Sequence, residues 1–426
     1  MSMLFGYKLK LCYTCRVGFQ SARRLTIAVL LLASSDFLQA ETVHLLQASL
    51  LGGQHFFEGE NSSLAGNFNI FYSPTYTLSE KWTLVGIYQG TYRGTKEVAD
   101  LAGGGTLFRE LANSRVGVRA IRKLSDKWSI KGMGGGKTEL LKETKDETWM
   151  KGLFDYRKAD AGLEVERRIE KGSAVRLNYS YFGLWFPNYE SLESKTNLGR
   201  ELAGKDTLDS SNHLATLEWE MPVNGLGSNP TIINLSGSNL LRHYPDQRTL
   251  LASGNYSTTK REDKTIYAGL NIKRPFALGA NWGAVPFVGT DWAQSDSNQS
   301  HQDANLAKFL PNYYDYSELR PSAGASFIWG NDPKTAKIFS FSSWYANRQY
   351  DQRLAQDVNG SYLTEKVWLK SLGVSLSASW PVGTQGTSLR ALVSTVSQDS
   401  NMKYEAVYRY NFSSANYLLG FSWELK

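Results

Sequence analysis

The chain has 426 residues, of which 47 are Lys or Arg, 40 are Asp or Glu and only two are Cys. It is rich in glycine and aromatic residues, with 38 Gly, 19 Phe, 12 Trp and 23 Tyr. This composition excludes a disordered tail, and the low cysteine content excludes a disulfide-rich scaffold. No run of about 18 nearly uncharged apolar residues occurs after residue 40, which excludes a bundle of membrane-spanning helices.

The start of the chain has the pattern of a secretory signal peptide. Basic residues precede an apolar run at 25–33, and this run is too short to anchor the chain in a bilayer. Ala40 is a small residue at the expected cleavage point, so we expect the mature chain to start at Glu41. We therefore predict a signal peptide at 1–40 and one domain at 41–426.

Removal of the signal peptide takes away most of the excess positive charge. It contains five basic residues and one acidic residue, which leaves 42 basic and 39 acidic residues and lowers the net charge from +7 to +3. No basic surface for nucleic acid is expected on such a chain. Cys12 and Cys15 are also removed, and a cysteine-free chain suits an oxidising compartment. The pair Arg23 and Arg24 leaves twin-arginine export as an alternative route.

From residue 42 onward, apolar and polar residues alternate over many short stretches. In one of them, Val175, Leu177 and Tyr179 alternate with Arg176 and Asn178. A period of two is typical of β-strands with one apolar face and one polar face. No stretch with a period of 3.6 and helix caps competes with this pattern. The mature chain is therefore predicted to be all-β.

The connections between these stretches alternate between short and long. Short turns rich in turn-forming residues are predicted at 78–81, 125–127, 170–173, 224–230, 277–281, 330–335 and 383–387. Long polar segments are predicted at 93–113, 139–150, 185–211, 241–263, 294–317, 349–364 and 397–412. This alternation predicts a transmembrane antiparallel up-and-down β-barrel with short periplasmic turns and long extracellular loops.

The scheme requires about 16 strands, within a range of roughly 14 to 18. The number depends on two segments. Residues 250–260 are assigned to an outer loop, and residues 404–410 are assigned to the last hairpin above the membrane. If either segment forms its own pair of strands, the count rises to about 18.

Three features predict that the apolar face points outward to lipid. A barrel of about 16 strands is too wide for side chains to fill its interior. The polar face carries Arg and Glu in mid-strand, which a dry core tolerates only when each charge is paired. Tryptophans also gather at predicted strand ends, as rings at the lipid headgroup levels do, namely Trp82, Trp128, Trp282, Trp329, Trp344, Trp368 and Trp380. The alternative is a soluble sandwich with aromatic residues at its strand termini.

The C-terminal segment SSANYLLGFSWELK has one continuous apolar face. Its members are Tyr417, Leu419, Phe421, Trp423 and Leu425. The segment resembles the terminal strand of bacterial outer-membrane β-barrel proteins of the porin-like kind, with Leu425 at the position that is usually aromatic. The resemblance implies a place in the outer membrane, contact with its lipid, and recognition of this strand by the barrel-assembly machinery.

A barrel of this width encloses water unless a loop or plug fills it. We therefore expect a porin-like channel for passive diffusion of small hydrophilic solutes. The polar partners in each alternation are predicted to line the pore, namely Arg115, Arg119, Lys131, Glu164, Glu166, Arg176, Glu218, Glu220, Arg320 and Arg390. Either these charges only keep the lumen hydrated, or they face one another across it and form a transverse field at a constriction.

Two other functions remain open at this point. One is a structural or adhesive surface barrel that binds through its outer loops, and the other is a loop-based outer-membrane hydrolase. A hydrolase would need a histidine beside a serine or carboxylate, and the candidates are His44, His55, His213, His243 and His301. His213 follows Ser210 and Ser211, but adjacent residues of a strand face opposite ways.

We accordingly expect no enzymatic activity, no cofactor and no metal site, because the spacing of known metal motifs is missing from the sequence. Two Gly-rich segments do not lie between a strand and a helix, as a phosphate-binding loop would. Residues 101–106 are predicted to be a loop, and residues 132–137 are predicted to let a strand bend or let an interior loop approach the wall.

Overall fold

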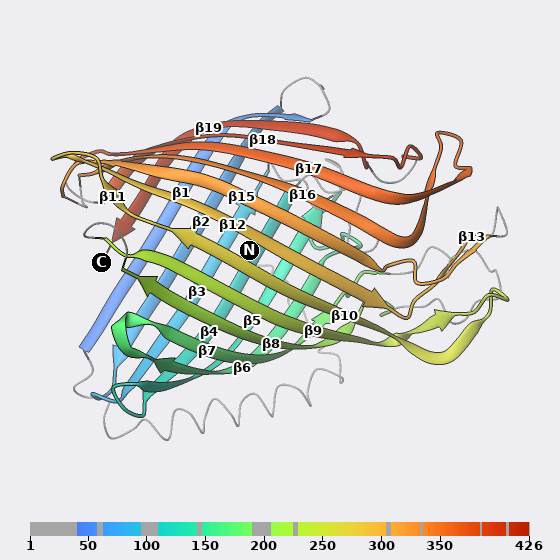
Figure 1. Cartoon of the computed structure of the whole chain (residues 1–426), viewed down its shortest axis with the longest axis horizontal. Coiled ribbons are helices and arrows are strands. Elements are labelled where there is room, and N and C mark those ends of the chain that lie inside the picture. Colours follow the sequence, from blue (N-terminus) through green and yellow to red (C-terminus); the bar gives the residue numbers. More distant parts are fainter. Residues whose placement is uncertain are drawn as a thin grey trace, which may run out of the picture.

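Strands begin at Glu41 and follow one another to Leu425 in the computed structural model, as the period-two pattern predicts (Figure 1). The structure describes residues 41–57, 63–94, 110–142, 147–189, 206–224, 229–303, 308–332, 335–383, 386–405 and 409–425. The predicted signal peptide and the glycines of 101–106 lie outside these residues. Within the described residues, no helix is long and apolar enough to cross a membrane.

Sixteen long antiparallel strands form the wall of a closed barrel. They are β1 (Glu41–Phe57), β2 (Ser63–Thr77), β3 (Trp82–Arg93), β4 (Glu110–Lys123), β5 (Trp128–Lys142), β6 (Tyr156–Arg168), β7 (Ala174–Trp185), β8 (Ser210–Val223), β9 (Thr231–Leu250), β10 (Tyr256–Lys273), β12 (Trp282–Ser297), β15 (Tyr316–Trp329), β16 (Lys337–Gln356), β17 (Tyr362–Pro381), β18 (Thr387–Ser400) and β19 (Phe412–Leu425). Short extra pieces are β11 (Phe276–Ala277), β13 (His301–Asp303), β14 (Lys308–Leu310) and the 3-10 turn η3 (Glu170–Gly172).

The barrel closes where β1 pairs with β19. This ladder runs from Leu46 opposite Leu425 to Phe57 opposite Ser414, while the other side of β1 pairs with β2. Every wall strand therefore has a neighbour on both sides over most of its length. Among the described residues no strand is left as an open edge of the wall, which is the condition for a sheet to cross lipid.

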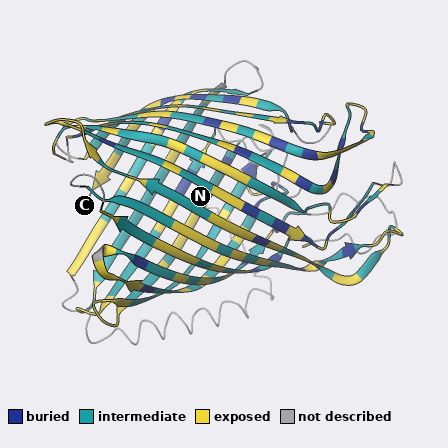
Figure 2. Ribbon diagram, viewed as in Figure 1, coloured by how far each residue is buried: buried dark blue, intermediate teal, exposed yellow. Residues whose placement is uncertain are grey.

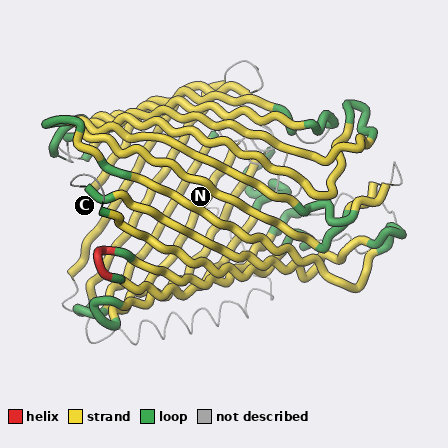
Figure 3. Tube along the Cα trace, in the orientation of Figure 1, coloured by secondary structure: helices red, strands yellow, loops and turns green. Residues whose placement is uncertain are grey.

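The predicted short turns all join consecutive wall strands, and their described residues lie together at one end of the barrel, here called the turn end (Figure 3). The described strand ends next to the long connections lie at the opposite end, here called the loop end. Two of the long segments differ from the prediction. Residues 241–263 and 349–364 are mostly strand, because β9 and β10 reach to within a five-residue turn at 251–255, and β16 and β17 leave only 357–361 between them.

The reason for this difference is that polar residues do not end a strand when its neighbour continues beside it. Outside the membrane, paired strands still satisfy each other's backbone groups. Both long hairpins show register shifts in this outer part, between Tyr256 and Lys260 and between Gln349 and Leu354. Neither hairpin adds a pair to the wall, and residues 401–405 follow β18 without regular structure, so the predicted count of 16 is confirmed.

Exposed and less exposed residues alternate along the wall strands (Figure 2). The exposed positions carry large apolar side chains on one face, such as Leu50, Val116, Leu177 and Leu419, whose exposed fractions are 55%, 59%, 56% and 57%. Ion pairs and polar clusters occupy the other face. A closed barrel that turns so much apolar surface outward is built to contact lipid.

Tryptophans form a belt on the outer face at the turn end. The rings of Trp282 and Trp329 stack with their centroids 5.6 Å apart, and Lys337 lies 4.0 Å from the Trp329 ring. The prediction that Trp344 lies at a strand end, at the level of the lipid headgroups, is wrong. Trp344 lies in the middle of β16 opposite Ser322, on the inner face, because its position has the parity of the polar residues. Trp368 lies within β17 rather than at its end.

Candidate functional site: the inner wall of the barrel

Ion pairs on β5, β6, β7 and β8 form one connected group on the inner face. We call this group the charge ladder, and it consists of Lys131, Glu164, Glu166, Arg168, Arg176, Glu218 and Glu220. The period of two brings Glu164 and Glu166 to the same face of β6, and register places Lys131 opposite Glu164. The Lys131 Nζ atom lies 2.6 Å from Glu164 Oε1 and 2.8 Å from Glu166 Oε2.

Glu166 is the centre of the charge ladder. Its side chain is only 8% exposed, and it accepts hydrogen bonds from Arg176 Nε at 3.1 Å and from Arg168 Nε at 3.3 Å as well as from Lys131. Arg176 continues toward β8, where its Nη1 atom lies 3.4 Å from Glu220 and 3.9 Å from Glu218. Three cations around one carboxylate compensate the cost of removing that carboxylate from water.

The charge ladder unites six of the ten predicted pore-lining residues, and its opposite charges are neighbours on one wall. The prediction that Glu164 and Glu166 face the cations across the lumen is therefore wrong, because adjacent antiparallel strands bring them side by side. Arg115 belongs to another pair and lies 3.7 Å from Asp160.

Arg119, Arg320 and Arg390 lie apart from the charge ladder. Arg119 on β4 is opposite Val85 on β3 and opposite Met133 on β5. The Arg320 guanidinium lies 4.2 Å from the Trp344 ring. These positions match the inner-face parity that the sequence predicts, but they do not form a common cluster with the other charges.

Arg390 lines a cavity of about 840 Å³ inside the barrel toward the turn end. Polar side chains from both sides of the closure share this lining, and they include Gln47, Ser49, Asn69, Gln89, Ser379 and Ser422. A space of this size with hydroxyl and amide groups around it suits water and small hydrophilic molecules.

The wall formed by β15 to β19 carries few charges, Arg320 and Arg390 among them, and is rich in hydroxyl groups. Ser326 and Ser340 place their Oγ atoms 2.9 Å apart, and Asn416 Nδ2 donates to Ser394 Oγ at 3.3 Å. The inner face thus has a charged side on β4 to β8 and a side of mostly serine on β15 to β19.

Sequence reasoning missed Lys137 and Lys158. Lys137 Nζ is hydrogen-bonded to Glu139 and, at 3.0 Å, to Tyr156 Oη, and Lys158 Nζ lies 4.0 Å from the centroid of the Phe182 ring. Both positions share the parity of inner-face residues on their own strands. Counting by twos from Lys131 and from Glu164 would have found them.

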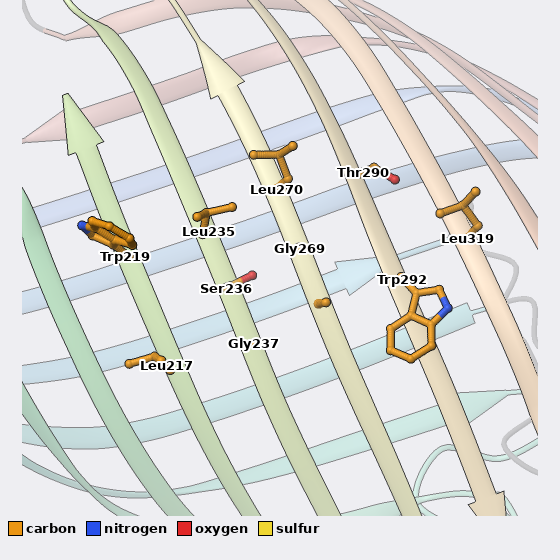
Figure 4. Close-up of a pocket in the computed structure, with 11 residues that line it drawn as sticks. Leu217, Trp219, Leu235, Ser236, Gly237, Gly269, Leu270, Thr290, Trp292 and Leu319 are labelled. Atoms are coloured by element: carbon orange, nitrogen blue, oxygen red, sulfur yellow. The ribbon is translucent and has the colours of Figure 1, made fainter. Parts of the chain in front are cut away.

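A second hollow, of about 510 Å³, lies on the outer face (Figure 4). Its walls are apolar side chains from β8, β9, β10, β12 and β15, namely Leu217, Trp219, Leu235, Leu270, Trp292 and Leu319. These residues have lipid-facing parity, so this hollow faces hydrocarbon and is not a site for a hydrophilic solute.

The histidines lie among aromatic, amide or acidic partners. His213 is on the outer face, where its Nδ1 atom is 2.7 Å from the Tyr179 hydroxyl, and His44 is 2.9 Å from the Tyr72 hydroxyl. His243 Nδ1 lies 3.4 Å from Glu262 in the β9–β10 hairpin. Across the described residues, no group of three or more His, Cys, Asp or Glu side chains could hold a metal ion.

Arg353 lies in a small core at the loop end. It is 2% exposed, donates to Tyr410 Oη at 2.7 Å, and lies 4.7 Å from the Tyr313 ring. The neighbouring Tyr314 lies 4.3 Å from Arg261, which also bonds to an aspartate of its own strand. Consecutive tyrosines thus connect the β9–β10 hairpin with the β16–β17 hairpin, and together these segments form a packed frame at the loop end.

The predicted assembly residues share one face of β19. Tyr417, Leu419, Phe421, Trp423 and Leu425 are 38–57% exposed on the outer surface beside β1. Gly420 lies between them on the inner face opposite Arg390.

The closed sixteen-stranded wall, its apolar outer surface and its polar inner surface define a transmembrane β-barrel of the fold found in outer-membrane proteins. Among solved structures, the chain is similar to OccK2 (OpdF) of Pseudomonas aeruginosa in complex with glucuronate, with 10% identity, 91% of this chain and 99% of that chain covered, and a TM-score of 0.43. It is also similar to OccAB1 of Acinetobacter baumannii, with 10% identity, 92% and 98% covered, and a TM-score of 0.42. OmpT of Vibrio cholerae, folded in vitro, gives 10% identity, 92% and 100% covered, and a TM-score of 0.39. No family model matches the chain, and neither does any curated protein.

Proposed function

We propose that this barrel is a porin-like channel for passive diffusion of small hydrophilic solutes. The observation that carries the proposal is the polar inner wall, with the charge ladder on one side and serines on the other. A dry interior would make so many ionised groups costly, whereas a wet lumen hydrates them. Sixteen strands give a barrel wide enough for such a lumen.

The pairing within the charge ladder favours a hydrating role for its members. Each carboxylate lies beside a cation at hydrogen-bond or ion-pair distance, so most of their field cancels on the wall itself. Arg115 differs from Lys131 and Arg176, because its carboxylate partner Asp160 lies at 3.7 Å and its side chain is 47% exposed. We therefore expect Arg115 to influence a passing ion more than Lys131 and Arg176 do.

We further infer that the chain is exported with a signal peptide that is cleaved after Ala40. We also infer that the barrel-assembly machinery recognises β19. The apolar run before Ala40 and the outer face of β19 support this route. The intact mass of the membrane-extracted protein should match a chain that starts at Glu41. A retained N-terminus would contradict the export route without affecting the channel proposal.

A liposome-swelling assay tests the channel directly. Vesicles that contain the folded protein should swell in isotonic solutions of small sugars, and the rate should fall steeply as the sugar becomes larger. Equal rates for vesicles with and without the protein would contradict passive diffusion. Retention of the folded band on an unboiled gel would show that the assayed protein was intact.

The frame of β9–β10 and β16–β17 at the loop end favours one second candidate, a surface barrel that binds through its outer loops. Its buried Arg353 and ring contacts hold the projecting hairpins in a fixed arrangement. No swelling by a well-folded barrel would favour this candidate. His213, which follows two serines in the sequence, is surrounded by tyrosines on the lipid-facing surface and does not favour a hydrolase.

A further inference from the structure

Three cations occupy one row across neighbouring strands near the loop end of the inner wall. Arg115 on β4 is opposite Lys137 on β5, and Lys137 is opposite Lys158 on β6. We call these three residues the basic row. Residues opposite each other in antiparallel strands have Cβ atoms about 4.5–5.5 Å apart. The row therefore places like charges next to each other, an arrangement that electrostatic repulsion destabilises.

Positive charge is in excess around the basic row. Arg119 lies four residues along β4 on the same face, whereas the neighbouring carboxylates are Glu139 and Asp160. Four cations and two carboxylates give this group a net charge of +2. The charge ladder below has three cations and four carboxylates, which gives it −1. The surplus of positive charge is therefore localised at the basic row.

Small residues leave space beside these cations. The next inner-face positions toward the turn end are Gly117 and Gly135, which are opposite each other in register. Because glycine has no side chain, the space between Arg119 and the basic row stays open. The Arg119 Nε atom and the Asp160 Oδ1 atom are buried and have no hydrogen-bond partner within the described residues, so an unpaired donor and an unpaired acceptor lie close to this space.

Two aromatic rings complete the surroundings. Lys158 Nζ lies 4.0 Å from the Phe182 ring centroid, and Lys137 Nζ lies 5.4 Å from the Tyr156 ring centroid while it is hydrogen-bonded to that hydroxyl. An organic anion bound by the ammonium groups would thus have an aromatic ring beside its carbon skeleton. Side-chain exposures of 47% for Arg115 and 25% for Lys137 leave both reachable from the lumen.

We infer that the basic row, with Arg119, is a binding site for the oxyanion group of a small organic solute, a carboxylate or a phosphate. Arg115 supplies a planar fork for two oxygens, and the lysines supply additional charge-assisted hydrogen bonds. The inference deepens the proposed function, because it names the class of solute that the channel favours. Neutral sugars diffuse through the lumen without binding to this site, whereas organic anions bind to it transiently.

Equilibrium titration calorimetry on the folded protein in detergent tests the site without any need for conduction. The probes are inorganic phosphate and benzoate, which separate the two oxyanion chemistries. Each charge-assisted hydrogen bond contributes about 1.5–3 kcal/mol, so Lys158→Gln is expected to weaken binding of the preferred probe roughly tenfold or more. Arg115→Gln should have a similar effect and serves as the second variant if Lys158→Gln does not fold.

Lys264→Gln is the matched control, because it removes the same charge from an exposed position on the outer side of β10. It should bind both probes as the unmodified protein does. Loss of binding on Lys264→Gln as large as on Lys158→Gln, or no binding of either probe to the unmodified protein, would overturn the site. Anion binding by a barrel that does not swell liposomes would support the site and overturn the channel, so the two failures are distinct.

Discussion

The Arg115 guanidinium on β4 lies 3.7 Å from the Asp160 carboxylate on β6, although β5 runs between these strands. The strand between them carries Gly135 at this level, and a Cβ atom there would lie 3.6 Å from Asp160 Oδ2 and 2.7 Å from the Val116 carbonyl oxygen. The contact across β5 is therefore favoured by the glycine at position 135. The contact joins two wall strands and involves no interior loop, so the role predicted for the glycine run at 132–137 stays a prediction.

Replacing Arg115 and Arg119 together by Ser should raise the single-channel conductance and shift ion preference toward cations. The reason is that two positive charges leave the inner wall while both nearby carboxylates stay. Reversal potentials in asymmetric salt measure the shift. No lipid-facing residue changes, so the unboiled gel band should be retained, and an unchanged reversal potential would remove these arginines from the narrowest part of the lumen.

Glu166→Gln should destabilise the folded barrel by about 1–3 kcal/mol, because Lys131, Arg168 and Arg176 lose the charge that they share. Glu218→Gln is its control. Glu218 is 51% exposed and 3.9 Å from Arg176, so its loss should change stability by about 0.5 kcal/mol or less. Urea unfolding in lipid vesicles measures both, and equal effects would contradict the central place of Glu166 in the charge ladder.

Gly53→Ala should impair closure of the barrel, whereas Gly52→Ala should be tolerated. A Cβ atom at Gly53 would lie 1.9 Å from the Tyr417 carbonyl oxygen across the seam with β19, and one at Gly52 meets nothing within 4 Å. Overpacking of this kind typically costs about 1–3 kcal/mol. The temperature at which the fast-migrating folded band disappears from a gel compares the two, and identical temperatures would mean that the seam relaxes freely.

Burial of Asp315 at the loop end raises the pKa of its carboxyl to about 6. The hydrogen bond from the Ser297 N–H lowers this pKa in part, whereas the negative charges of Asp296, Asp351 and Asp263 raise it further. A raised carboxyl pKa favours the folded loop at low pH. This contribution is complete below the ordinary value of 3.8 and is lost as the pH rises through about 6.

Hydrogen exchange of the Asp351 amide, which donates to the Asp315 carbonyl oxygen at 3.0 Å, reports this loop. After correction for the intrinsic rate, its protection should be higher at pH 5 than at pH 7.5. Asp315→Asn should abolish the difference, because the amide does not titrate. The same pH dependence in the variant would assign the effect to another group.

The strand positions and the two faces could be predicted because a barrel in lipid enforces a strict period of two. Trp219 and Glu220, for example, are assigned to opposite faces by parity alone. The inner position of Trp344 was missed because aromatic character, rather than parity, guided its assignment. Pairing among Lys131, Glu166 and Arg176 depends on register between strands, and no local pattern in the sequence fixes that register.

The outer hairpins show a different limit of sequence reasoning. The long polar stretch at 241–263 is typical of a loop, yet paired strands continue through most of it. Arg261 and Arg353 are buried there against tyrosines from separate segments. Charged residues usually indicate exposure, so only tertiary structure reveals a core that is built around them.

Single-channel recording from the purified protein in a planar bilayer measures whether the lumen conducts ions. We expect discrete conductance steps in salt solution, with a nearly linear current–voltage relation, because a permanently wet lumen is lined by polar side chains. Correctly folded protein that inserts into the bilayer without any conductance would contradict the channel.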